Sequence, residues 1–260
     1  MREQLRPVNR WAVLAAQLLI TLAVLALWEW GGRAGWIDKV YFSKPSDIVA
    51  QVADWWRHGY IGNDVLVTME ETIVGLVIGA FAGIVLGIVL ASNRFVSAVF
   101  EPLLVLLNSM PRITLVPLFI LWFGFSFAAK VMSVIALVVF VVFFATYAGI
   151  RDVDPTLVAS ARVLGATRLD VVRHVLIPSA LTWIFSSLRS AVGFAVIGAV
   201  VAEYFGANAG VGYRIQYSES NFNTAGVFAG LFVLMVLVTL VDAFIRWVQR
   251  RLIVWKPAAL

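Results

Sequence analysis

The chain has 260 residues, of which 62% are hydrophobic and 13% charged, and its mean hydropathy is +0.92. Soluble proteins average about 45–50% apolar and about 25% charged residues, so this composition excludes an ordinary soluble domain and indicates an integral membrane protein. The chain has no cysteine and two isolated histidines, His58 and His174, so it offers no disulfide and no metal cluster. Its net charge of +5 is not gathered in a basic tract, which excludes an obvious nucleic-acid surface.

Nearly charge-free runs of the length that crosses a bilayer, about 20 residues, occur six times. The first follows Arg2, Arg6 and Arg10. It is longer than the core of a signal peptide and lacks a small-residue cleavage pattern, so we expect it to be retained. We predict an all-α membrane protein whose six transmembrane helices occupy roughly residues 11–30, 68–92, 99–125, 131–150, 179–203 and 222–245.

The distribution of lysine and arginine predicts the orientation of these helices. Twelve of these residues fall in the segments that share a side with the two termini, and six fall in the segments on the other side. Because cytoplasmic segments carry the excess of positive side chains, we expect both termini to be cytoplasmic.

The polar segment 31–64 follows the first span on the outer side. It includes "SKPSDIVAQVADWWRHG", which has the start signals and the apolar spacing of a short amphipathic helix. We expect this helix at the membrane interface, with Trp55 and Trp56 at headgroup level. A contact with a substrate donor is the alternative.

The second predicted span has a glycine at every fourth position. Small residues at this spacing bring helix backbones close together in membranes, so we expect tight packing against another helix. A static contact and a gliding surface for a moving core both remain open. The four residues are Gly75, Gly79, Gly83 and Gly87.

Residues 154–178, between the fourth and fifth spans, contain their own helix signals. Asp154 before Pro155 is typical of a helix start, because the carboxylate accepts free backbone N–H groups and proline at the first position gives up no hydrogen bond. Gly165 provides a left-handed stop. We therefore predict that a first short helix ends at a glycine turn.

A second short helix is expected after that turn. Thr167 and Asp170 have the spacing of a capping box, and Pro178 indicates the next break. A connecting loop needs no such order, so the pattern indicates a docking element on the cytoplasmic side.

The sequence ASA at 159–161, followed by Gly165 and VLIP at 175–178, resembles the "EAA…G…I-x-L-P" signature of permease subunits of ABC importers. Ala159 stands where that family has glutamate, and Ser160 where it has its first alanine. The resemblance implies a coupling helix that contacts an ATPase. The residues that it implicates are Ala159, Ser160, Ala161, Arg162, Leu164, Gly165, Ala166, Thr167 and Pro178.

Three further stretches, "NSMPRITLVPLFILWFG", "VVAEYFGANAGVGY" and "RRLIVWKP", resemble the nitrate, sulfonate, taurine and bicarbonate type of permease. The resemblance implies a type I importer (MetI-like) fold, with two permease subunits, two ATP-binding subunits and an extracytoplasmic substrate-binding protein. It also implies a bacterial inner-membrane location and a homodimer of permeases. Residues 1–30 would then be the cytoplasmic start and first helix, 31–64 an extracytoplasmic loop, 65–250 the permease core and 251–260 a cytoplasmic tail.

The chain has no Gly-Lys pair and therefore no Walker A loop for ATP phosphates. We expect no cofactor and no metal in this chain, with ATP and Mg²⁺ bound by the partner ATPase. No covalent chemistry is expected here.

Two arginines interrupt the predicted spans, where a charge costs about 2.5–3.5 kcal/mol at the helix centre. Arg112 lies between Pro111 and Pro117, where free backbone groups need protein or water, so we place it on the translocation pathway. For Arg189, a pathway position and snorkelling toward the interface are equal alternatives. Both charges suit an anionic solute.

Polar neighbours complete the candidate pathway. Asn108 and Ser109 adjoin the Pro111 break and Ser186 adjoins Arg189, but each also has its own helix to bond. Glu203 and Tyr204 end the fifth span, where a gate, a binding-protein contact and an ordinary solvated helix end are the alternatives.

Other acidic residues have structural interpretations. Glu70 and Glu71 are expected to mark the outer end of the second span. Asp242 has the spacing to pair with Arg246 near the inner surface.

Two other function classes would need different sequence features. A secondary transporter driven by an ion gradient needs carboxylates near the bilayer midplane, whereas the acidic residues here are predicted at span ends. An intramembrane enzyme needs a nucleophile and base or a metal cluster within the spans. Within the importer class, the solute stays open among nitrate, a sulfonate, bicarbonate, an aromatic carboxylate and a vitamin precursor.

Overall fold

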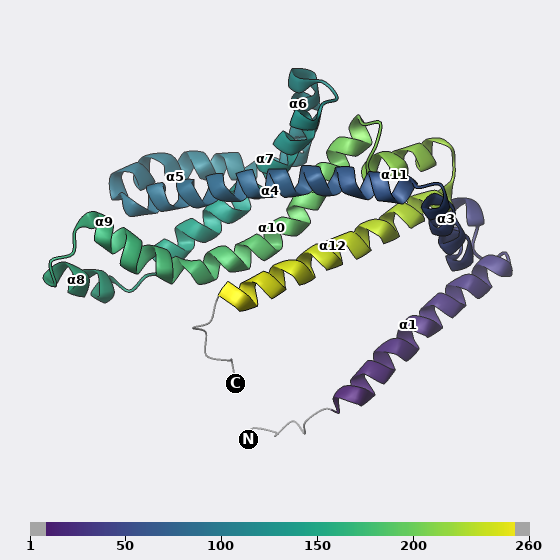
Figure 1. Ribbon diagram of the computed structural model, residues 1–260, viewed down its shortest axis with the longest axis horizontal. Helices are drawn as coiled ribbons and strands as arrows, with labels where there is room; N and C mark the ends of the chain where they lie inside the picture. The colour runs from purple at the N-terminus through teal and green to yellow at the C-terminus, as the bar shows by residue number, and fades with distance from the viewer. Residues whose placement is uncertain (1–8, 253–260) are drawn as a thin grey trace. The chain divides into compact units, whose positions relative to one another are not determined.

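The structure is a computed structural model that describes residues 9–252, and every regular element in that range is helical (Figure 1). The predicted cytoplasmic residues Arg2 and Arg6, and residues 253–260 of the predicted tail, lie outside the described part. The chain forms two compact units. One contains the described residues up to Ile61 and Ile215–Phe232, and the other contains Gly62–Arg214 and the described residues from Val233 onward.

Five helices are long and apolar enough to cross a membrane, and a bent pair raises the number to six. This agrees with the predicted all-α membrane fold. The five are α1 (Arg10–Arg33), α4 (Tyr60–Ser92), α7 (Phe127–Arg151), α10 (Ile177–Phe205) and α12 (Thr224–Leu252).

The predicted third span is not one straight helix. It consists of α5 (Arg94–Ser109), the 3₁₀ turn η1 (Arg112–Leu115) and α6 (Val116–Phe123), with a bend of 83° between the two halves. Pro111 precedes η1, and a proline cannot continue the hydrogen-bond ladder of a preceding helix. The break therefore falls at Pro111, whereas Pro102 lies within α5 and Pro117 in the first turn of α6.

The core of the larger unit forms where small and β-branched side chains repeat every fourth residue. On α7 these are Val134, Val138 and Val142, and α10 supplies alanines at 191, 195 and 199. All six side chains are buried. Small side chains at this spacing let helix backbones approach closely.

The glycine face of α4 lies against the same valine face of α7. A Cβ added at Gly75 would lie 2.4 Å from Cβ of Val134, and one at Gly83 would lie 2.7 Å from the carbonyl oxygen of Val139. The other two contacts are Gly79 with Val138 and Gly87 with Thr146. The backbones therefore approach too closely at these positions for any side chain larger than hydrogen.

The smaller unit contains α1, α2 (Lys39–Phe42) and α3 (Pro45–Arg57). Glu29 of α1 accepts hydrogen bonds from the backbone N–H and the hydroxyl of Ser46, both at 2.9 Å, which fixes the start of α3. The prediction that both tryptophans of α3 face the membrane interface is wrong for Trp55, which is buried with Ile48 and Ala229. Trp56 is exposed.

Candidate functional site

The segment between α7 and α10 begins with the capped helix α8 (Pro155–Val163). The Asp154 carboxylate accepts a hydrogen bond from the backbone N–H of Thr156 at 2.8 Å. Hydrogen bonds from Thr156 hold the pKa of Asp154 below its usual value, because they favour the charged form. The predicted helix start is therefore present, and it is an anionic cap.

A tight turn ends α8. Gly165 has a φ of +87°, a left-handed conformation that side chains rarely adopt. After the turn, Thr167 and Asp170 cap each other: the Thr167 N–H and hydroxyl donate to Oδ2 of Asp170, and the Asp170 N–H donates to the Thr167 hydroxyl. The chain then enters α9 (Arg168–Val171).

The second short helix does not end at Pro178 as predicted. A π-helical turn, η2 (Val172–Leu176), joins α9 directly to α10, and Pro178 lies in the first turn of α10. The Ile177 N–H donates to the Val172 carbonyl oxygen, the i→i−5 bond of the π turn, and Pro178, which has no N–H to donate, follows directly after this local change of the helix. A continuous helical path therefore leads from the Gly165 turn into the fifth span.

Apolar side chains project from the turn. Val163 and Leu164 are each 87% exposed, and Leu169 is 74% exposed. The other implicated positions, Ala159, Ser160, Ala161 and Arg162, lie within α8, and Ala166 follows Gly165. Contiguous exposed apolar residues of this kind mark an interaction surface.

Arg112 lies at the break between α5 and α6. Its guanidinium donates to the backbone carbonyl of Asn108 at 3.1 Å and to the Asn108 side chain, and it lies 4.8 Å from the ring centroid of Phe140. Its Nε is buried and has no hydrogen-bond partner among the described residues. Ser109 bonds its own helix at Val105. The geometry therefore leaves one donor of Arg112 unused.

Arg189 is paired rather than free. Its Nε lies 2.9 Å from Oδ1 of Asp242, and Arg246 binds the other oxygen of the same carboxylate, as the i,i+4 spacing predicted. The Arg189 side chain is 53% exposed, and Ser186 on the same helix is exposed. One carboxylate therefore serves two guanidinium groups.

Glu203 is not a solvated helix end. Its side chain is 1% exposed, and its two oxygens accept hydrogen bonds from the Thr68 hydroxyl at 2.6 Å and from the Gly212 N–H at 2.7 Å. Tyr204, its neighbour, is 37% exposed. Burial of a carboxylate costs free energy unless hydrogen bonds compensate, so these contacts hold Glu203 in place.

The same cluster caps the start of α11 (Val211–Ser220). Gly210 N–H donates to Oδ1 of Asp64 at 3.0 Å, and Val211 N–H donates to the Thr68 hydroxyl oxygen at 2.9 Å. Together with Glu203, three side chains from α4 and α10 satisfy N–H groups that a helix start leaves free. Gly210 has a φ of +113°, and a Cβ there would lie 2.3 Å from the Glu203 carboxyl.

A buried ion pair adjoins this cluster. Lys130 of α7 donates to Oε1 of Glu71 at 2.7 Å, and the two side chains are 10% and 1% exposed. Glu71 lies inside α4, which begins at Tyr60, so this helix continues beyond the predicted outer end of the second span.

The sequence pattern of α4 could have predicted this buried polar cluster. Asp64, Thr68, Glu71 and Thr72 are buried and continue the glycine face of α4 at spacings of three and four. Polar side chains on the buried face of a membrane helix need partners, so this stripe predicts a polar contact to neighbouring helices.

The family described as "Binding-protein-dependent transport system inner membrane component" matches residues 83–254. An aliphatic sulfonates transport permease protein of Bacillus subtilis is 31% identical over 92% of this chain and 87% of its own length. A formylaminopyrimidine transport permease protein of Halalkalibacterium halodurans is 32% identical over 92% and 94%. The Escherichia coli taurine permease protein is 26% identical over 90% and 88%.

Among solved structures, a chain of the MetNI methionine ABC transporter matches with a TM-score of 0.64. Its sequence identity is 20%, and the match covers 72% of this chain and 94% of that chain. At this identity the likeness shows the fold alone.

Proposed function

Because the chain belongs to the family of binding-protein-dependent transport system inner membrane components, we propose that two copies of it form the translocation pathway of an ATP-driven importer. It is a multi-pass membrane permease subunit of the sulfonate and taurine type, and not an enzyme. In the proposed assembly, two ATP-binding subunits hold ATP and Mg²⁺, and an extracytoplasmic binding protein delivers the solute.

The observation that carries the ATPase contact is the exposed apolar turn at Val163 and Leu164. A helix held by an Asp154 cap and a Gly165 turn presents these side chains outside the candidate spans. When an ATPase covers Val163 and Leu164, it removes apolar surface from water, and this lowers the free energy of the complex. This supports residues 154–178 as the coupling segment.

A path for the coupled motion follows from the helix contacts. Displacement of the Gly165 turn passes through η2 into α10 without an intervening loop. The alanine face of α10 packs on α7, and α7 packs on the glycine face of α4. At the four glycine positions α4 presents no side chain to interlock with α7, so this part of the contact can shift with few rotamer changes.

The proposed solute is a small anion. Relatives of nearly equal identity are named for aliphatic sulfonates and for formylaminopyrimidine, so their names do not choose between these solutes. The preference for an anion therefore depends on the positive charge of Arg112. Its unused buried Nε–H beside an irregular backbone suits an anion passing the break. Arg189, which shares Asp242 with Arg246, is the weaker candidate.

The proposed orientation has both termini in the cytoplasm, on the positive-side-chain distribution of the sequence. Membership of the permease family argues against the alternative of an ion-driven secondary transporter. The acidic residues do not argue against it, since Glu71 and Glu203 are buried inside the helical core.

Co-purification tests the coupling segment. The tagged chain is expressed together with the ATP-binding subunit of the proposed assembly. The Gly165→Pro and Leu164→Arg variants are compared with the unaltered chain. We expect ATPase recovery to fall about tenfold or more, because proline cannot adopt a φ of +87° and a charge replaces a buried apolar contact. Val40→Arg, at another exposed apolar position, is the matched control. Equal ATPase recovery by all four chains would refute the coupling proposal.

Uptake tests the anionic pathway. Arg112→Gln is expected to lower uptake of the anionic solute about tenfold, the effect of losing about 1.4 kcal/mol of attraction, and Arg112→Lys to retain part of it. Arg57→Gln removes an exposed arginine elsewhere and serves as the control. Unchanged uptake by Arg112→Gln at normal expression would remove Arg112 from the pathway.

A further inference from the structure

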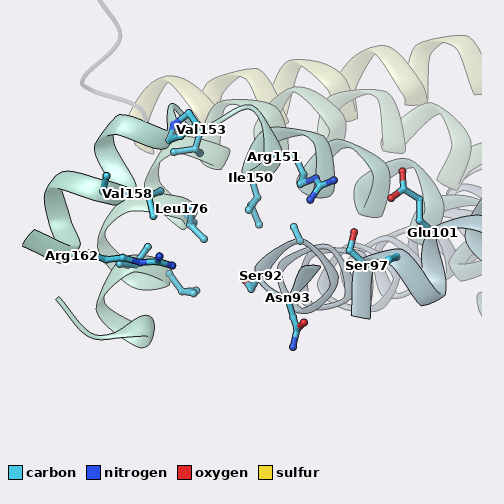
Figure 2. A pocket seen from close by; sticks show the side chains of 16 residues that line it. Ser92, Asn93, Ser97, Glu101, Ile150, Arg151, Val153, Val158, Arg162 and Leu176 are labelled. Carbon is cyan, nitrogen blue, oxygen red and sulfur yellow. The ribbon is translucent and has the colours of Figure 1, made fainter. Parts of the chain in front are cut away.

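A cavity of about 1170 Å³ lies between α8 and the ends of the spans (Figure 2). Its walls come from the end of α4, the start of α5, the end of α7, α8 and the α9–η2 turn. The cavity is thus bounded on one side by the proposed coupling helix and on the other by the helices that it is proposed to move.

One face of α8 lines the cavity. The lining positions 155, 158, 159 and 162 have helical spacing, whereas Leu157 and Leu164 are not among the lining residues. The two sides of α8 therefore differ. The exposed apolar turn at its end is available to the proposed ATPase, and the side that carries Arg162 borders the cavity (Figure 2).

The cavity has a positive lining. Arg151 and Arg162 supply two guanidinium groups, and neither makes an ion pair among the described residues. The one acid in the lining, Glu101, accepts a hydrogen bond from the Tyr147 hydroxyl at 3.0 Å. Guanidinium groups match phosphate oxygens in a two-pronged geometry.

Neutral polar groups adjoin the arginines. Ser92, Asn93 and Ser97 line the same cavity. Oδ1 of Asn93 already caps α5 through the N–H groups of Phe95 and Val96, which leaves the Asn93 amide with N–H donors to offer. The Ser97 hydroxyl is already bonded to the Tyr147 hydroxyl, so the donors that the polar side offers an anion are the Asn93 amide and the two guanidinium groups.

The remaining wall is apolar, with Ile150, Val153, Val158, Val171 and Leu176. The cavity also lies where apolar helices stop: α4 ends at Ser92, α7 ends at Arg151 and α10 begins at Ile177. The ends of apolar helices are where we expect the hydrocarbon of a bilayer to give way to headgroups. A ligand with an anionic phosphate and an apolar tail fits both walls.

We propose that this cavity binds the headgroup of an anionic phospholipid, with its phosphate on the polar side that Arg151 and Arg162 line and its acyl chains along the apolar wall. Basic pockets between membrane helices bind anionic lipid headgroups in this way. The bound lipid would fill the space behind α8 and so support the coupling segment. This inference rests on the proposed function, because it takes residues 154–178 as the coupling segment.

Native mass spectrometry of the full-length chain, released from nanodiscs, tests the lipid site directly. The nanodiscs contain phosphatidylglycerol and phosphatidylcholine in equal amounts. We expect the unaltered chain to retain phosphatidylglycerol selectively, and the Arg151→Gln/Arg162→Gln double variant to retain about tenfold less. Val158→Trp, which fills the cavity and leaves the charges in place, is expected to lose the lipid as well.

The matched control is Lys39→Gln/Arg57→Gln, which removes two exposed positive charges elsewhere and should retain the lipid. Equal retention by the arginine double variant overturns the proposal. Displacement of the lipid by millimolar inorganic phosphate would also overturn it, because the site would then bind the free ion. The readout needs no ATPase, so failure of ATPase coupling and failure of lipid binding are distinguishable.

Discussion

Thr68 on α4 donates its hydroxyl hydrogen to Oε1 of Glu203 on α10, with 2.6 Å between the oxygens, although 135 residues separate them in sequence. The other Glu203 oxygen accepts the Gly212 N–H at the start of α11. A single buried carboxylate therefore joins two long helices to the first turn of a third.

Glu203→Gln should destabilise the chain. The amide has one acceptor oxygen in place of two, so the Thr68 hydroxyl must turn to the Asp64 carbonyl oxygen, 3.0 Å away, and the added N–H donors need acceptors inside the core. A buried group left without a partner costs about 1–3 kcal/mol. The measurement is the thermal unfolding midpoint in mild detergent.

Glu70→Gln is the matched control, because Glu70 lies on the same helix as Thr68 and is exposed. A Glu203→Gln midpoint equal to that of Glu70→Gln would show that the buried hydrogen bonds do not support this junction.

Lys130→Met should cost more than the replacement of both members of its ion pair. With Lys130 gone, Glu71 retains a carboxylate that is 1% exposed and has no cation beside it. Breaking a buried pair costs about 3–5 kcal/mol, whereas apolar or neutral replacement of the whole pair is often nearly neutral. Unfolding by sodium dodecyl sulfate measures the difference.

The double variant Glu71→Gln/Lys130→Met completes the cycle, and we expect it to recover most of the lost stability. If the double variant is as unstable as Lys130→Met, the cost comes from the missing lysine side chain and not from the unpaired charge.

Hydrophobic runs predicted the helices well because a bilayer demands about 20 apolar residues for each crossing. The α8 cap, the Gly165 turn and the Thr167–Asp170 capping box were predicted because each depends on neighbours within four residues. These local features need no tertiary information.

Long-range polar contacts were not predicted. Glu203 near the end of α10 resembles a solvated terminus in sequence, and only the approach of Thr68 and Gly212 buries it. Trp55 was assigned to the interface for the same reason, since its burial depends on Ala229 far along the chain. The sequence pattern gives the face of a helix but not the partner of that face.

Gly83→Ala should loosen the contact between α4 and α7. The added Cβ would lie 2.7 Å from the Val139 carbonyl oxygen and 3.0 Å from the Phe143 nitrogen, and both are backbone atoms that cannot rotate away. Overpacking of this kind costs about 1–3 kcal/mol. Thermal unfolding in mild detergent measures the loss.

The control is Gly62→Ala on the same helix, where an added Cβ meets nothing within 4 Å. That substitution should be neutral or slightly stabilising, because alanine has the higher helix propensity. Equal midpoints for the two variants would mean that α4 and α7 are not in close contact.

The Asp154 cap should make the order of α8 depend on pH. The pKa of Asp154 is lowered below its ordinary value of 3.8 in the folded chain, chiefly by hydrogen bonds from Thr156. A depressed pKa stabilises the helix start above pH 3.8, and this stabilisation is lost as the pH falls through the lower folded value. Amide hydrogen exchange at Thr156 and Leu157, corrected for the intrinsic rate at each pH, measures the order of the first turn.

Two variants separate the cap from its charge. Asp154→Ala should raise corrected exchange several-fold at neutral pH, because the first-turn N–H groups lose their acceptor. Asp154→Asn retains an acceptor oxygen but has no titrating proton, so its corrected exchange should stay low and change little between pH 6 and pH 3. If the Asn variant follows the same pH profile as the unaltered chain, another group controls the start of α8.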